Sequence, residues 1–236
     1  RALNALEVAV LTTPPGADGR VRVTLPVMEA SIQRKAVVYD RDEDGHYDTI
    51  SAFIKSVRGS DPHAAVYWLA KMLVAGEDPR FIARRLVILA AEDIGNADPR
   101  GLTLATSAMH AAEFVGMPEA RIVLAQATTY LACAPKSNAS CLAVDKAMQD
   151  VRQGRTLPVP RHLRNVKIQP ANLPADESYV YPHDFKGHFV AQEYAPTATR
   201  YYEPTGEGYE DVMRKRLEAW EAMRRAAAKG EGRGAA

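Results

Sequence analysis

The sequence predicts a mainly α-helical protein of short antiparallel helices stacked on one another, and two observations support this prediction. The dipeptide Asp-Pro recurs at residues 61, 78 and 98, each time just before a run of helix-forming residues. Aspartate favours the N-cap because its carboxylate accepts hydrogen bonds from free backbone N–H groups, and proline fits the first helical turn. Apolar residues in the following runs recur every three or four positions, which is typical of amphipathic helices. We therefore expect Asp61, Asp78 and Asp98 to cap three successive helices.

The region before these caps is predicted to be helical with one acidic loop. Apolar spacing indicates helices over residues 1–11, 26–35 and 47–57, and alternation over residues 21–25 favours a short extended piece. The acidic loop, residues 40–48, has aspartates and a glycine spaced as in a calcium-binding EF-hand. However, Ser51 stands where that loop needs a glutamate to hold calcium with both oxygens. A solvated loop leading into the next helix is therefore expected, and calcium binding is not.

The middle of the chain continues the stack. Further helices are expected from Pro62, Pro79, Pro99 and Pro118 and after Asn138, each touching neighbours on two sides because their apolar positions fill more than one stripe.

From Arg155 onward the composition changes. Seven of the fifteen prolines lie between residues 158 and 204, and six of the ten tyrosines lie between residues 179 and 209, so regular helices are excluded there. We expect an irregular Pro/Tyr-rich segment, with one short hairpin at most, that wraps the helical body and buries its tyrosines with their hydroxyls paired. A final helix is expected over residues 210–228, with frayed residues 229–236 after it.

Composition narrows the class of protein. Lys and Arg total 30 against 29 for Asp and Glu, a formal charge of +1, which excludes a globally basic nucleic-acid binder but leaves room for basic patches. Cys133 and Cys141 lack metal-ligand spacing and are interpreted as small buried residues in a reducing compartment. A signal-peptide pattern and a membrane-length apolar run are both absent from the sequence, so a cytoplasmic location is expected. The chain starts at Arg1 inside a helical pattern, and we therefore expect it to be a fragment of a longer protein.

Chemical motifs are few. The sequence lacks a Gly-rich phosphate loop and a nucleophile elbow, so no catalytic residue is predicted. A small helical enzyme built on Glu92, Asp93 and His110 is the weakest hypothesis, because the carboxylates near Asp98 are better explained as helix-end partners. The histidines at 183 and 188 lack further ligands nearby in sequence, so no metal site is predicted.

Basic residues offer candidate contacts to DNA or to a partner. They lie near the ends or along the faces of the expected helices: Lys55, Arg58, Arg84, Arg85 and Lys136. Such residues can contact a phosphate backbone, although solvated faces and ion pairs are the commoner use of such clusters. A free-standing helical module that binds protein or DNA is accordingly kept as the alternative function.

Several strings resemble one family in both order and spacing: residues 1–7, 46–61, 83–86, 91–99, 130–138, 162–165 and 181–184. Among them, Ser-Val-Arg-Gly-Ser (56–60) and Ala-Pro-Lys-Ser-Asn (134–138) are the most specific. Together they resemble the C-terminal half of the bacterial replication-associated recombination protein A family (RarA, also MgsA). These are clamp-loader-like AAA+ ATPases related to the Werner-helicase-interacting ATPase.

The resemblance implies a clamp-loader collar-like helical fold, with the end of an AAA+ lid over residues 1–73 and an oligomerisation domain over residues 74–236. It implies a homotetramer at stalled replication forks, acting with single-stranded or fork DNA and single-strand-binding protein, and located in the cytoplasm at the nucleoid. It implies DNA-stimulated ATP hydrolysis in the full-length protein, with ATP and Mg²⁺ held by a core outside these residues. Arg1 aligns with the second arginine of the family's Gly-Asp-Ala-Arg-Arg lid motif, so it stands at the edge of the nucleotide-sensing position.

Overall fold

The computed structural model describes residues 6, 9–16, 18–29, 43–164 and 178–231 of the 236-residue chain. Within those ranges the regular structure is helical and no strand is assigned. The chain divides into two compact units, one made of residues 1–90 and 100–134, the other of residues 91–99 and 135–236. A mainly α fold is therefore confirmed, and each unit is described by itself.

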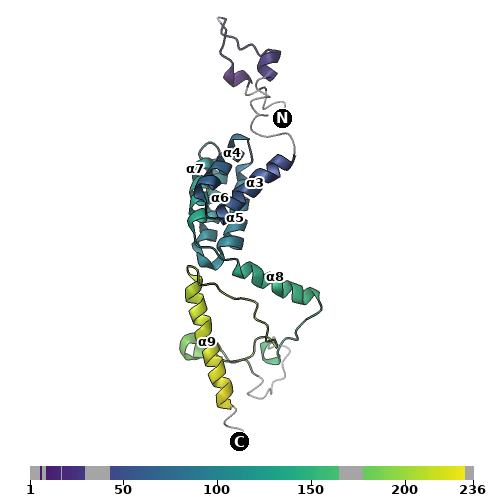
Figure 1. The fold of residues 1–236 in the computed structure, drawn as a ribbon, viewed down its shortest axis with the longest axis vertical. Coiled ribbons are helices and arrows are strands. Elements are labelled where there is room, and N and C mark those ends of the chain that lie inside the picture. The colour runs from purple at the N-terminus through teal and green to yellow at the C-terminus, as the bar shows by residue number, and fades with distance from the viewer. Residues whose placement is uncertain (1–5, 7–8, 17, 30–42, 165–177, 232–236) are drawn as a thin grey trace. The chain divides into compact units, whose positions relative to one another are not determined.

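The first unit is a stack of helices joined by short connections (Figure 1). Consecutive helices α3 and α4, α5 and α6, and α6 and α7 pack against one another, and α7 also contacts α3, α4 and α5. Helix α7 is therefore the centre of this unit. The helices have these bounds: α3 Glu43–Arg58, α4 Pro62–Val74, α5 Pro79–Leu89, α6 Arg100–Val115 and α7 Ala120–Cys133.

The core of the first unit follows from helical spacing. Helix α7 buries Leu124, Ala127 and Leu131 on one face, at intervals of three and four residues. The neighbouring helices contribute large buried side chains, including Phe53, Val57, Met72, Ile82, Leu86 and Leu89. Helix α6 instead buries alanines, and such small side chains let two helix backbones approach closely. The predicted stacking is thus produced by a continuous apolar core.

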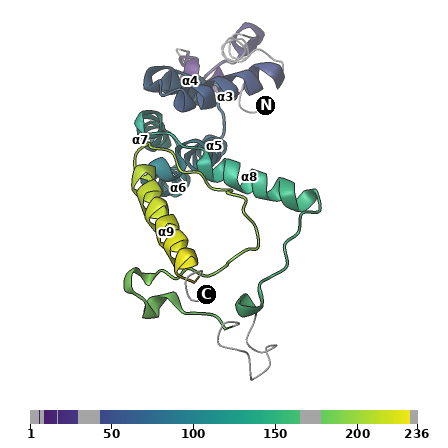
Figure 2. The same ribbon diagram turned by 60° about the horizontal axis from the view of Figure 1, so that its bottom comes forward.

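The second unit is built from shorter pieces and two helices, α8 (Ala139–Arg152) and α9 (Glu210–Glu231). A π-helical turn at Ala90–Ile94 and a 3-10 turn, η2, at Gly95–Ala97 follow α5, and η2 contacts both α8 and α9. Figure 2 shows the irregular stretches between α8 and α9, residues 153–164 and 178–209. Its short 3-10 turns are η3 Arg161–Leu163, η6 Pro182–Asp184 and η7 Lys186–His188.

The irregular segment is held to α8 and α9 by side-chain contacts. Lys146 Nζ donates to the carbonyl of Arg200 at 2.7 Å, and the Tyr201 hydroxyl donates to the Asp150 carboxylate at 2.9 Å. The ring of Phe189 stacks on Trp220 of α9, with the ring centroids 6.0 Å apart. The predicted irregular segment is therefore present in the second unit, and these contacts attach it to α8 and α9.

One expectation about that segment is wrong. Its tyrosines are not buried as a group, because Tyr179, Tyr181, Tyr194 and Tyr209 are exposed while Tyr201 and Tyr202 are half-buried. The two half-buried tyrosines are those whose hydroxyls donate to carboxylates of α8 and α9, Asp150 and Glu210. Residues 153–164 and 178–209 contain no hairpin, which agrees with an expectation of one at most, and residues 165–177 lie outside the described ranges.

Helix boundaries differ from the prediction at several ends. Helix α3 begins at Glu43, so residues 43–48 are helical rather than a loop, and the chain runs straight through Gly45 where a calcium loop would turn. Acidic residues favour a helix N-terminus because of the helix dipole, which explains this earlier start. Helix α7 begins at Ala120 rather than at Pro118, and α9 continues to Glu231, past the predicted end at residue 228.

Some N-terminal expectations fall partly outside the described residues. Residues 9–12 are helical, as predicted for 1–11, whereas residues 21–24 carry no regular structure. The helix predicted over residues 26–35 is seen from residue 25 to residue 29. Residues 30–42, which include the start of the acidic run, lie outside the described ranges.

The cysteines and α8 also depart from the prediction. Both thiols are free, but Cys133 is exposed and Cys141 half-exposed, because each lies on a helix face that points away from the core. In α8 the only buried residue is Ala139, although this helix was expected to pack on two sides. A search for membrane spans found no helix of sufficient length and apolarity among the described residues.

Candidate functional site

Two of the predicted caps occupy N-cap positions. Asp61 Oδ1 accepts a hydrogen bond from the backbone N–H of Ala64 at 2.9 Å, at the start of α4. Asp78 Oδ1 accepts one from the backbone N–H of Arg80 at 2.9 Å, at the start of α5. Hydrogen bonding from the Arg80 side chain and backbone lowers the pKa of Asp78 below its ordinary value. Asp98 directly follows η2 with an extended backbone, and its side chain is buried, so its capping of α6 stays a prediction.

Replacing Asp78 with alanine is expected to destabilise the first unit by about 1 kcal/mol, the usual effect of losing an N-cap. Urea denaturation in a Trp220→Phe background would report it, because Trp68 is then the only tryptophan and lies in the first unit. Glu119→Ala is the matched control, since Glu119 holds the N-cap position of α7 without a side-chain cap bond. Equal loss in both variants would contradict a capping role for Asp78.

Two of the three acidic residues between α5 and α6 are buried, which does not suit an open catalytic site. Asp93 and Asp98 are buried, and the Asp93 carbonyl accepts a hydrogen bond from the Ser137 backbone N–H at 2.8 Å. His110 is an exposed residue of α6 in the first unit. Across the described residues, no group of three or more His, Cys, Asp and Glu side chains gathers in metal-binding geometry.

The basic candidates come from three stretches of the chain: the end of α3, helix α5 and the residues just before α8. Lys55 and Arg58 are exposed in the last turn of α3, and Arg84 is exposed on α5. Arg85 is half-buried, and its Nε is buried without a hydrogen bond to any described residue. Lys136 is half-buried in the second unit, just before α8. Arg1, the residue at the edge of the sensing motif, lies outside the described residues.

The most organised polar site is centred on Glu210, the first residue of α9, which sequence reasoning missed. Its side chain is fully buried, at 0% exposure. Oε2 accepts hydrogen bonds from the Ser137 hydroxyl at 2.7 Å and from the Thr205 backbone N–H and hydroxyl, both at 2.8 Å. Oε1 accepts one from the Tyr202 hydroxyl at 2.9 Å. A buried carboxylate needs such donors to offset its lost hydration.

This network joins three separate stretches of the chain. Tyr202 and Thr205 come from the irregular segment, and Ser137 precedes α8. The amide of Asn96, in η2, donates to the Ser140 hydroxyl at 3.1 Å and to the Tyr202 hydroxyl at 3.4 Å. Two of the strings that carried the resemblance, residues 91–99 and 130–138, therefore meet here through Asn96 and Ser137. In this structure Asn96 and Ser137 stabilise the second unit through these hydrogen bonds.

Glu210 remains charged within this site. Burial raises the pKa of its carboxyl, but the hydrogen bonds from Ser137, Thr205 and Tyr202 together outweigh that effect, so the pKa is lowered below its ordinary value of 4.5. Four donors to one carboxylate favour the anion because each of them stabilises negative charge.

The second unit is accordingly expected to lose stability in acid. Because the folded-state pKa of Glu210 is lowered, its contribution is fully present above about pH 4.5 and is lost as the pH falls through the folded-state value. Urea denaturation between pH 3 and 6, followed by Trp220 fluorescence in a Trp68→Phe background, would show this slope. In Glu210→Gln the same slope should become shallower, because the variant has no carboxyl to protonate. An unchanged slope would mean that other acids cause the loss.

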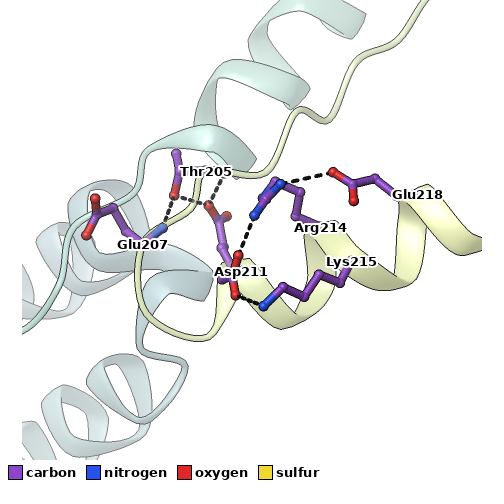
Figure 3. Close-up of polar contacts among 7 residues, drawn as sticks. Thr205, Glu207, Asp211, Arg214, Lys215 and Glu218 are labelled. Carbon is purple, nitrogen blue, oxygen red and sulfur yellow. Dashed lines mark hydrogen bonds and ion pairs between the residues drawn. The ribbon is translucent and has the colours of Figure 1, made fainter.

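The first turns of α9 add an exposed charge cluster beside this site (Figure 3). Asp211 forms ion pairs with Arg214 and Lys215, and Arg214 also pairs with Glu218. Hydrogen bonds from Lys215 and Arg214 lower the pKa of Asp211. Pairs three and four residues apart stabilise a helix only modestly when exposed, so this cluster supports the helix start.

Only one weak signal for the Glu210 site exists in the sequence. Glu210 and Asp211 follow a glycine-rich turn, and acidic residues are favoured at a helix N-terminus. That signal predicts an exposed carboxylate near the helix start. The partner Ser137 lies 73 residues away along the chain, so its pairing could not be read from local pattern.

The described residues form a mainly α-helical protein whose most organised polar site stabilises the fold. Comparison with known families assigns its class. The family model described as "AAA C-terminal domain" matches residues 1–58, and the one described as "MgsA AAA+ ATPase C terminal" matches residues 59–221. The chain belongs to the MgsA AAA+ ATPase C-terminal family. The two models meet between residues 58 and 59, whereas the boundary expected from the sequence lies between 73 and 74.

Curated relatives agree with that family. An uncharacterized AAA domain-containing protein of Mycobacterium tuberculosis is 49% identical over 94% of this chain and 50% of its own length. The replication-associated recombination protein A of Bacillus subtilis is 44% identical over 91% of this chain and 52% of its own. The protein of that name from Escherichia coli is 42% identical over 93% and 50%. The chain thus spans about half the length of the curated relatives it matches.

Proposed function

We propose that this chain is the assembly part of an AAA+ ATPase that acts in DNA replication and recombination at stalled forks. The main support is its match to the C-terminal family of MgsA ATPases over residues 59–221. In this proposal residues 1–73 are the end of the helical lid, and residues 74–236 join four copies of the protein into a homotetramer. Exposed apolar side chains on several helices, among them Phe114 and Ile122, are compatible with contacts between copies.

The proposed mechanism is mechanical. ATP and Mg²⁺ are held by the ATPase core, in the half of the relatives that this chain does not span, and the full-length protein hydrolyses ATP when it binds DNA. The chain itself turns over no substrate and binds no cofactor. Arg1 lies at the edge of the lid motif that senses nucleotide. The assembled chains hold four cores around single-stranded or fork DNA in the cytoplasm, together with single-strand-binding protein.

Analytical ultracentrifugation of this chain tests the assembly role. A tetramer at micromolar concentration is expected, with no ATPase activity of its own. A strictly monomeric chain at high micromolar concentration would overturn the proposal. Restoration of DNA-stimulated ATPase activity only in the longer protein, and its loss when the tetramer is dissociated, would support the mechanical link between the two parts.

Contact with DNA through exposed basic residues is a second proposal, favoured by Lys55 and Arg84. Both side chains are exposed, and neither is ion-paired within the described part of the chain. Arg58, Arg85 and Lys136 remain weaker candidates for the same role.

Binding of single-stranded DNA would show this contact by its salt dependence. Losing one phosphate contact should lower the slope of log K against log salt by about 0.7 in Arg84→Ala. Arg121→Ala is the control, because Arg121 already donates to the Pro118 carbonyl. Equal slopes in wild type and Arg84→Ala would exclude a phosphate contact at this position.

A further inference from the structure

Helix α8 has one face occupied and the opposite face open. Lys146 and Asp150, which lie on one side, are bound by the irregular segment at Arg200 and Tyr201. At 100° per residue, Val144, Met148 and Val151 fall on the other side, within a narrow stripe. These three side chains are 52%, 44% and 60% exposed. Apolar residues spaced by four and three positions on one helix are the pattern of a packing face.

We propose that this face of α8 packs against α8 of a second copy of the chain, in antiparallel orientation, around a two-fold axis at Met148. The inference rests on the proposed assembly function and names the surface that one contact of the tetramer would use. A two-fold contact uses the same patch on both copies, so the patch must be self-complementary, and a tetramer can combine two such contacts.

The apolar stripe meets that requirement. With the axis at Met148, each methionine faces its copy, and Val144 of one helix lies beside Val151 of the other. These two positions differ by one residue in their distance from the axis, which is about 1.5 Å along the helix. Ala147 lies on the flank of the stripe, and its small side chain lets the two backbones approach. The apolar contact therefore repeats itself under the two-fold operation.

Charged residues on the flank opposite Ala147 favour one register of the two α8 helices. Asp145 and Arg152 lie on the same side of the stripe, three residues before and four residues after Met148. An antiparallel two-fold pair brings matching flanks together, so Asp145 of each copy comes opposite Arg152 of the other. Neither residue is ion-paired within the described part of its own chain. One arrangement thus pairs the apolar stripe with itself and forms two ion pairs.

Exchanging the charges tests this register in the whole chain. Asp145→Arg should bring its new guanidinium near Arg152 of the second copy, and Arg152→Asp should place two acids together. Each reversal creates two like-charge contacts and should raise the dissociation constant roughly tenfold. The double variant Asp145→Arg/Arg152→Asp should restore association, because each pair is formed again with its signs exchanged. Sedimentation velocity at low salt measures all four proteins, and far-UV circular dichroism checks their helix content.

Cysteine cross-linking tests the axis. In a Cys133→Ser/Cys141→Ser background, Met148→Cys should link two chains under mild oxidation or with a short bismaleimide, because residue 148 faces itself. Val74→Cys is the control, an exposed apolar position in the last turn of α4 in the first unit. A tetramer that neither cross-links at 148 nor responds to charge reversal would overturn the α8 contact and leave the proposed function standing. Weakening by single reversals without restoration in the double variant would also overturn it. A monomeric wild type would overturn both proposals.

Discussion

Replacing Glu210 with alanine is expected to destabilise the second unit by about 3 kcal/mol. The substitution removes the buried carboxylate that is the common acceptor of Ser137, Thr205 and Tyr202. A buried donor left without a partner costs about 1–3 kcal/mol, and only part of this can be recovered by reorienting hydroxyl groups. The backbone N–H of Thr205 cannot reorient, so it contributes most directly to the loss.

Urea denaturation followed by Trp220 fluorescence in a Trp68→Phe background measures this change in the correct unit. Glu207→Ala is the matched control, because Glu207 is an exposed glutamate three residues earlier in the same turn. Glu210→Gln should fall between the two, since its amide keeps one acceptor and the shape of the side chain. An effect of Glu210→Ala no larger than that of Glu207→Ala would show that the network does not stabilise the fold.

Replacing Gly208 with alanine is expected to lower the free energy of unfolding of the second unit by about 3 kcal/mol. The reason here is steric. Gly208 has φ of +54°, a left-handed conformation that L-residues with a Cβ rarely adopt. An added Cβ would also overlap the carbonyl oxygen of Ala97 and lie 2.8 Å from the Pro135 ring, far inside van der Waals contact. The backbone of η2 would have to move, and its bond to the neighbouring Tyr209 N–H would be strained.

Substitutions at two other glycines separate the cost of the left-handed backbone from the cost of the steric overlap. Gly154 has φ of +79° with open space around its position, so Gly154→Ala measures the conformational cost alone, about 1–2 kcal/mol. Gly206 has open space and no left-handed backbone, so Gly206→Ala should be close to neutral. All three glycines lie in the second unit, so the fluorescence of Trp220 reports the unfolding of each variant. Equal losses at 154 and 208 would mean that the close approach to Ala97 contributes nothing.

Helix caps and helix core faces depend on residues close together in the sequence, whereas the Glu210 network depends on residues far apart. Asp61 and Asp78 cap helices through bonds that span three and two residues, and the core face of α7 repeats within its own turns. These patterns can be recognised within a few residues of sequence. The stacked helices could therefore be predicted. The start of α3 at Glu43 was missed because the acidic run matched both a loop and a helix start.

The helical class, the approximate positions of the helices in the first unit and the kinship with MgsA ATPases can all be predicted from local sequence patterns and the family strings. The burial of Glu210, the exposure of the α8 stripe and the contacts of residues 91–99 with α8 and α9 are seen only in the folded chain. They could not be predicted because the residues involved lie far apart along the chain. The bond between Glu210 and Ser137 spans 73 residues and that between Asn96 and Tyr202 spans 106, so neither partner leaves a local trace that reveals the other.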